Sequence, residues 1–191
     1  MVWRRKKNTS GGIYAFIDSQ NLNIGSQKVG FKVNWKKLHD FLKNEHGVTR
    51  AFLFVGYIPE YEDMYKQLHD HGFSVVLKQT QDLTRVVKDD KKNEDKPVKG
   101  NVDTDLVLWA MKEINNYNKA ILISSDGDFL SLVEYLDKQG KMEKIMVPNG
   151  SYSHLFNKFD KYVLRLDKVQ DKIAMPRSSM RKKHYDKNKR K

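Results

Sequence analysis

The stretch 120–129 constrains the fold more than any other part of the chain. It opens with the uninterrupted apolar run 120–123 and passes through two serines into Asp126 and Asp128, which a glycine separates. A continuous apolar run of this kind is typical of a strand buried on both faces, as in a parallel sheet. Apolar residues then recur at helical spacing until Gly140. The stretch therefore predicts a strand, a turn that carries both aspartates, and a helix.

These two aspartates allow a structural and a functional interpretation. In open α/β sheets, ligands bind at the carboxyl ends of the strands, which is where Asp126 and Asp128 are expected. Either residue could equally serve as the N-cap of the following helix, beside a turn glycine. The choice depends on whether other acidic residues are expected at the same edge.

Strand and helix patterns alternate through residues 13–167. Besides 120–123, apolar runs typical of strands occur at 13–17, 51–57, 73–77, 145–147 and 162–166. Helical patterns lie at 34–47, 59–72, 101–117 and 152–159, whereas the residues around 22–27 are expected to form a loop with a helical turn. This order predicts one α/β domain with a central, mostly parallel sheet and helices on both faces.

The net charge of +12 lies in the two ends of the chain. Residues 1–12 carry +4 and residues 168–191 carry +8, so residues 13–167 are neutral. We expect these basic, apolar-poor tails to be disordered and to attract polyanions, above all nucleic acid; improved solubility is the alternative interpretation. The residues expected to bind nucleic acid are Arg4, Arg5, Lys6, Lys7, Arg177, Arg181, Lys182 and Lys183.

Composition excludes several classes of protein. The chain has no cysteine, which rules out disulfides and thiolate metal sites. No apolar run approaches the roughly 20 residues of a membrane span, and no apolar signal segment follows the basic start, so a cytoplasmic location is expected.

The segment 80–100 is long and highly charged, which suits a surface insertion or a flap over the active face.

Two further regions offer acidic residues at the same edge. Asp18 ends the strand 13–17, and Asn21 follows three residues later. In the helix 101–117, Asp103 and Asp105 cannot share a face. Helical phase places Asp103 within the apolar arc and Asp105 roughly 120° from its centre. A carboxylate on a buried face is costly unless it is paired or binds a cation, so Asp103 is the better candidate ligand.

Convergence of Asp18, Asp103, Asp126 and Asp128 would require a cation. Two carboxylates about 4 Å apart repel by roughly 4 kcal/mol at an effective dielectric constant of about 20. A divalent ion offsets this repulsion, and oxygen ligands favour Mg²⁺ or Mn²⁺. Such a site can activate water and hold a phosphodiester for in-line attack.

The motifs resemble those of the NYN domains, a family of PIN-like ribonucleases, and within it the LabA-like group. The resemblance covers residues 12–167. It rests on Phe-Ile-Asp-Ser-Gln-Asn-Leu at 16–22, Lys-Gly-Asn-Val-Asp-Thr-Asp at 99–105, Ser-Ser-Asp-Gly-Asp-Phe at 124–129, and the closing segment 153–166. It implies a PIN-like three-layer α/β sandwich, an acidic metal site and RNA hydrolysis.

Taken together, these features predict a metal-dependent endoribonuclease that hydrolyses single-stranded RNA. The catalytic metal ligands would be Asp18, Asp103, Asp126 and Asp128, supported by Asn21, Asp105, Ser125 and Lys99, with Lys99 placed to hold a phosphate. A non-catalytic RNA-binding or regulatory module of the same fold is the alternative, and hydrolysis of small nucleotides is a third. No membrane partner is expected, and the sequence is compatible with a homodimer.

Overall fold

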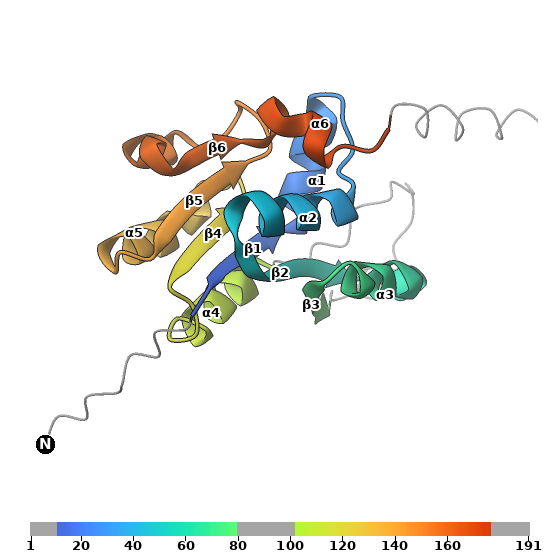
Figure 1. Ribbon diagram of the computed structural model, residues 1–191, viewed down its shortest axis with the longest axis horizontal. Coiled ribbons are helices and arrows are strands. Elements are labelled where there is room, and N and C mark those ends of the chain that lie inside the picture. Colours follow the sequence, from blue (N-terminus) through green and yellow to red (C-terminus); the bar gives the residue numbers. More distant parts are fainter. Residues whose placement is uncertain (1–10, 80–101, 177–191) are drawn as a thin grey trace, which may run out of the picture.

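Six strands form one sheet in the order β3-β2-β1-β4-β5-β6, and all neighbouring strands are parallel (Figure 1). The computed structural model describes residues 11–79 and 102–176. The strands are β1 (Ile13–Asp18), β2 (Val48–Tyr57), β3 (Phe73–Gln79), β4 (Lys119–Ile123), β5 (Met142–Val147) and β6 (Val163–Arg165). The predicted parallel α/β sheet is confirmed.

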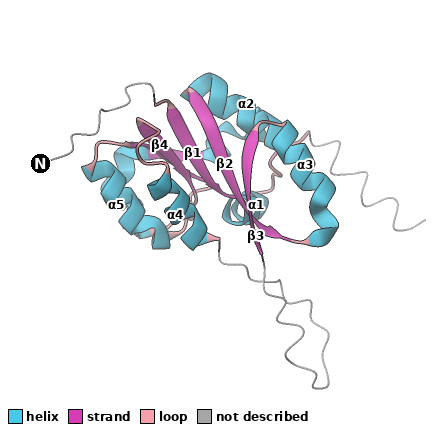
Figure 2. Ribbon diagram, turned by 90° about the horizontal axis from the view of Figure 1, so that it is seen from below, coloured by secondary structure: helices cyan, strands magenta, loops and turns pink. Residues whose placement is uncertain are grey.

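Helices cover both faces of the sheet and make three layers (Figure 2). One face carries α1 (Ser19–Lys28), α2 (Trp35–His46), α3 (Glu62–Asp70) and α6 (Gln170–Ile173); the other carries α4 (Asp103–Lys112) and α5 (Leu130–Lys138). The remaining helical segments are 3-10 turns: η1 (Pro59–Tyr61), η3 (Gly127–Phe129), η4 (His154–Tyr162) and η5 (Leu166–Val169). Within the described residues, no helix combines the length and apolar character needed to cross a bilayer.

The order of the strands reverses between β1 and β4, whose carboxyl ends lie side by side. The chain moves outward from β1 through β2 and β3, then returns to the other side of β1 and continues through β4, β5 and β6. At such a reversal, the connections leave in opposite directions and open a ligand-binding crevice. Ile17 pairs with Ile123 in this register, so the residues that follow each of them lie next to each other at this edge of the sheet.

Alternation along the strands decides which layer these residues face. Phe16 packs in the core beneath α4 and α5, whereas Ile17 packs in the core on the α1 and α2 side. Because strand side chains alternate with a period of two, Asp18 faces the α4 layer. The same alternation from Leu122 places Ser124 on that side.

Two helix predictions need correction. The expected loop around 22–27 is the ten-residue helix α1, which begins directly after β1 because Asp18 caps it and Leu22 and Ser26 are buried along one side. The predicted helix 101–117 is shorter, since α4 ends at Lys112. Tyr117 follows a turn and donates its hydroxyl hydrogen to the carbonyl of Ala110, which satisfies that buried polar group.

The folded chain also extends past the predicted boundary at residue 167. Ile173 of α6 is fully buried, Ala174 forms an antiparallel bridge with Val33, and the N–H of Met175 donates to the carbonyl of Lys32 at 2.9 Å. The prediction that the tail begins at 168 is therefore wrong for residues 168–176. Residues 1–10, 80–101 and 177–191 lie outside the described residues, and with them Lys99 and all eight basic residues predicted to bind nucleic acid.

Candidate metal centre

Asp18 is the last residue of β1, at the carboxyl edge of the sheet, and is only 5% exposed. One carboxylate oxygen, Oδ1, accepts the backbone N–H of Asn21 at 3.0 Å and caps α1. The other, Oδ2, accepts the hydroxyl of Ser124 at 3.3 Å. These contacts fix the carboxylate at the junction of β1, β4 and α1.

The environment of Asp18 disfavours its charge. The pKa of Asp18 is raised from its ordinary value of 3.8 to about 6, mainly by burial and to a smaller extent by the charges of Asp103 and Asp126. The hydrogen bonds from Asn21 and Ser124 act in the opposite direction and lower it. Asp103 and Asp126 therefore lie close enough to act on Asp18. A buried carboxylate that two others repel is characteristic of a functional site.

Ser124 and Asn21 hold the two strand ends together. The fully buried hydroxyl of Ser124 donates to Asp18 and accepts the N–H of Asp126 at 3.2 Å. The side-chain oxygen of Asn21 accepts both the N–H of Ser125 at 2.9 Å and its hydroxyl at 2.8 Å. Ser124 opens the motif at 124–129, but Ser125 and not Ser124 was predicted to support the site; the alternation from Leu122 could have placed Ser124 beside Asp18.

Asp126 is both a helix cap and a neighbour of Asp18. As the N-cap of η3, its Oδ1 accepts the N–H of Asp128 at 3.0 Å. The side chain of Asp128 is exposed and is not among the charges that shift the pKa of Asp18. The charges of Asp103 and Asp126 thus act on Asp18, while the role of Asp128 stays a prediction.

The first turn of α4 separates its two aspartates. The charge of Asp103 acts on Asp18, whereas Oδ2 of Asp105 lies 3.2 Å from Nζ of Lys78 at the end of β3. This placement agrees with the helical phase of the two residues. Asp105 therefore neutralises a lysine at the end of β3, to the side of Asp18.

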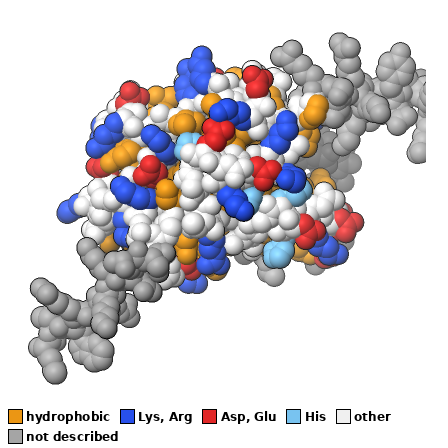
Figure 3. Space-filling view, viewed as in Figure 1, with side chains coloured by type: hydrophobic (Ala, Val, Ile, Leu, Met, Phe, Trp, Pro, Cys, Tyr) orange, Lys and Arg blue, Asp and Glu red, His pale blue; other side chains and the backbone are white. Residues whose placement is uncertain are grey.

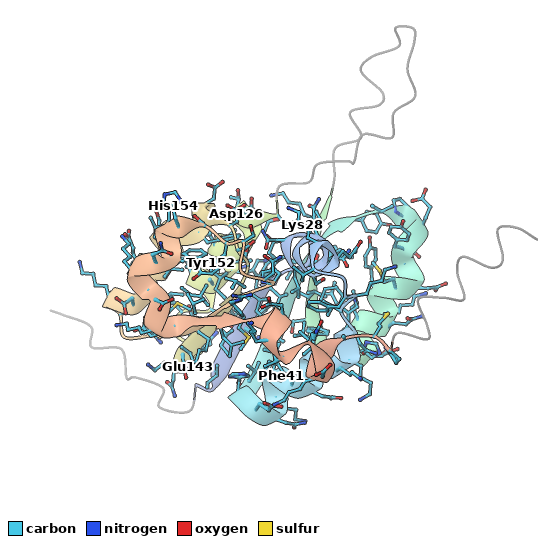
Figure 4. The ribbon with its side chains drawn as sticks, turned by 90° about the horizontal axis from the view of Figure 1, so that it is seen from above. Lys28, Phe41, Asp126, Glu143, Tyr152 and His154 are labelled. Atoms are coloured by element: carbon cyan, nitrogen blue, oxygen red, sulfur yellow. The ribbon has the colours of Figure 1, made fainter. Side chains whose placement is uncertain are left out.

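The loop after β5 supports the turn that carries Asp126. The N–H of Ser153 donates to the carbonyl of Ser125 at 3.1 Å. A Cβ atom on Gly127 would lie only 2.4 Å from Oγ of Ser153, so the two segments are in close contact. In Figure 4, His154 and Asp126 lie at the same end of the molecule, opposite Phe41 and Glu143.

The donor set suits a hard divalent cation. Asp18, Asp103 and Asp126 offer carboxylate oxygens, and a cation would stabilise the charged form of Asp18, which burial and the two neighbouring charges disfavour. Within residues 11–79 and 102–176, no three Asp, Glu or His side chains are grouped closely enough to hold a metal ion between them as they stand. Mg²⁺ usually keeps several waters and binds through one or two carboxylates, so the arrangement fits a hydrated ion.

Comparisons with known proteins agree with this architecture. A protein of unknown function from Vibrio parahaemolyticus shares the fold: its crystal structure superposes with a TM-score of 0.63 at 18% sequence identity, over 90% of this chain and 100% of that one. No curated protein matches the sequence. The sequence model of the NYN domain family matches residues 12–167. This range includes β1 through β6 and Asp18, Asp103 and Asp126. The chain therefore belongs to the NYN domain family, whose members are PIN-like, nuclease-like domains.

Proposed function

We propose that this protein is a metal-dependent endoribonuclease that hydrolyses phosphodiester bonds of single-stranded RNA. The observation that carries the proposal is the buried carboxylate of Asp18, whose pKa is raised to about 6 by burial and by the charges of Asp103 and Asp126. Keeping a charged carboxylate buried lowers the stability of the folded protein, and a bound cation offsets this loss. Membership of the NYN domain family, whose domains are nuclease-like, also supports phosphodiester hydrolysis.

The residues around Asp18 have distinct roles in this proposal. Asp18, Asp103 and Asp126 would hold Mg²⁺ or Mn²⁺, and the ion when bound would supply charge stabilisation at the phosphoryl group and an activated water. Ser124 and Asn21 fix the positions of the two strand ends. Asp128 is exposed and would add a fourth carboxylate to the ion.

Substitution of the aspartates tests this proposal. We expect Asp126→Asn and Asp103→Asn to lose at least about 99% of Mn²⁺-dependent cleavage of single-stranded RNA, because removal of one charged ligand typically costs 10²-fold or more. Asp105→Asn, a matched change two residues away, should lose much less, since Asp105 pairs with Lys78. The measurement is the initial cleavage rate on a labelled RNA at saturating Mn²⁺.

The same assay distinguishes the alternatives. Equal activity of wild type and Asp126→Asn would refute the metal-centre assignment. Chelator-insensitive RNA binding without any product would instead favour a non-catalytic module, and turnover of small nucleotides in preference to RNA would favour a nucleotide hydrolase.

The basic tail gives a second prediction, on affinity. The described residues hold 18 Lys or Arg and 18 Asp or Glu, and Figure 3 shows both signs interspersed over the face it presents. Residues 177–191 carry +7. Deleting them should flatten the salt dependence of RNA binding, by about 0.7 in the logarithmic slope for each phosphate that the tail would otherwise neutralise.

The deletion should leave the melting temperature unchanged, because α6 and its contacts with the loop before α2 remain. The measurement is a fluorescence-anisotropy titration at several salt concentrations. An unchanged slope would place the RNA contacts elsewhere in the chain.

A further inference from the structure

Lys78 is positioned to reach beyond the metal centre along the carboxyl edge of the sheet. Asp18 pairs with Phe54, and Lys78 pairs with Gly56, two residues further along β2. Lys78 lies two strands across and two residues along from Asp18. With ordinary strand spacing and rise, their Cα atoms are roughly 12 Å apart. Lys78 faces the same layer as Asp18, because it contacts Asp105 of α4.

The contacts of Lys78 leave it able to bind an anion. Its Nζ lies 3.2 Å from a single carboxylate oxygen of Asp105, and the side chain is 31% exposed. An ammonium group has three N–H donors, and this pair uses one direction only. Arg165 is the other basic residue at the carboxyl end of a described strand, and its Nε and Nη2 both bind Asp167, at 3.1 Å and 2.6 Å.

Building on the nuclease function proposed above, we infer that Lys78 binds a phosphate of the RNA strand beside the cleaved bond. The cleaved phosphate would lie at Asp18, so a phosphate at Lys78 belongs to a neighbouring nucleotide. Because three carboxylates at the centre repel the RNA backbone, a cation on the flank offsets part of that repulsion. This binding would make the enzyme selective for polynucleotides over simple phosphodiesters.

A structural role for the ion pair makes a different prediction. An ion pair in which both side chains are about 30% exposed adds little to stability, because solvent screens it. Lys78→Ala should therefore fold normally. If the pair serves to hold α4 against β3, Lys78→Ala and Asp105→Asn should have equal effects, whereas phosphate binding should weaken only when the lysine is removed.

The test compares two substrates with the full chain and Mn²⁺: a short single-stranded RNA and bis(p-nitrophenyl) phosphate. We expect Lys78→Ala to raise KM for RNA roughly fivefold at low salt, with kcat retained. The slope of the logarithm of RNA affinity against the logarithm of salt concentration should become shallower by about 0.7. Activity on the small diester should stay within about twofold of wild type. Lys36→Ala, which removes a lysine paired with Asp40 at 2.9 Å on α2 of the opposite layer, should change neither.

Three outcomes would overturn the inference: an unchanged KM for RNA, an equal loss on both substrates, or equally weakened RNA binding by Asp105→Asn in EDTA. If wild type cleaves neither substrate, the proposed nuclease function fails by itself. The effect of Lys78→Ala on RNA affinity in EDTA still decides whether Lys78 binds phosphate in that case, because the titration needs no turnover.

Discussion

Asp18→Asn should make the metal-free protein more stable than wild type by about 3 kcal/mol at pH 7. The pKa of Asp18 is raised from 3.8 to about 6, and each pKa unit corresponds to about 1.4 kcal/mol. Asparagine can keep the N-cap contact with Asn21 and accommodate Ser124. For a domain of this size, the gain corresponds to a rise in melting temperature of about 6–12 °C.

The pH dependence of this gain follows from the sign of the shift. Because the folded state binds a proton at Asp18 more readily than the unfolded state, wild type loses stability as the pH rises from about 4 to 6, and the loss is constant above that. Burial lowers the pKa of His39 and His46, so these groups contribute stability that is lost as the pH falls below about 6.5. The histidines are common to both proteins and cancel in the difference.

Thermal unfolding of both proteins in EDTA between pH 4 and 8 measures the effect. The difference should be small at pH 4 and reach its full size above pH 6. Mn²⁺ should then stabilise wild type and narrow the gap, since a ligand stabilises the folded state that binds it. A variant no more stable than wild type at pH 8 would show that the carboxylate of Asp18 is not strained.

Gly127→Ala should impair the site through packing alone. The added Cβ would lie 2.4 Å from Oγ of Ser153, 3.1 Å from its Cβ and 3.0 Å from Cδ1 of Leu155. Rotation of the serine relieves the first contact but breaks the N-cap bond that its Oγ accepts from the N–H of Leu155, and the contact with its Cβ remains. We therefore expect the turn that carries Asp126 to shift. Overpacking of this kind costs about 1–3 kcal/mol, and a displacement of about 1 Å at a catalytic group can cost 10²-fold in rate.

A double-mutant cycle checks this explanation. Ser153→Gly removes Oγ and Cβ but keeps the N–H that binds Ser125. It also removes the N-cap bond to the N–H of Leu155, so the Ser153→Gly single variant is the reference for the double variant. Gly127→Ala combined with Ser153→Gly should therefore recover most of the stability and cleavage rate that Gly127→Ala alone loses. Additive losses in the double variant, measured by denaturant unfolding and RNA cleavage, would contradict a steric cause.

Local sequence patterns were sufficient for most of the secondary structure. The helix α2 begins after Asn34, which caps it, and ends at Gly47, whose φ of 64° suits glycine. Both ends depend on short-range hydrogen bonds and backbone strain that a few residues specify. The pattern failed at α1, because this helix has only two buried residues, Leu22 and Ser26, and its start depends on Asp18.

The extent of the folded chain could not be predicted from local patterns. Residues 168–176 look like a basic tail in composition, yet Ile173 is fully buried. Its burial depends on α2 and on the loop at Val33, more than a hundred residues earlier. Composition averages over a window and cannot detect one apolar residue that finds a distant partner.

Local patterns in the chain were enough to place Asp18 and Asp126 after buried strands, and to point Asp103 and Asp105 in different directions from one helix. These placements depend on periods of two and 3.6 residues, which are properties of the local backbone. The folded structure was needed to show that β1 and β4 are neighbours, that Ser124 bridges Asp18 to Asp126, and that Asp105 pairs with Lys78. Strand order and cross-strand contacts depend on how the layers pack around two shared cores, and no single stretch of sequence contains that information.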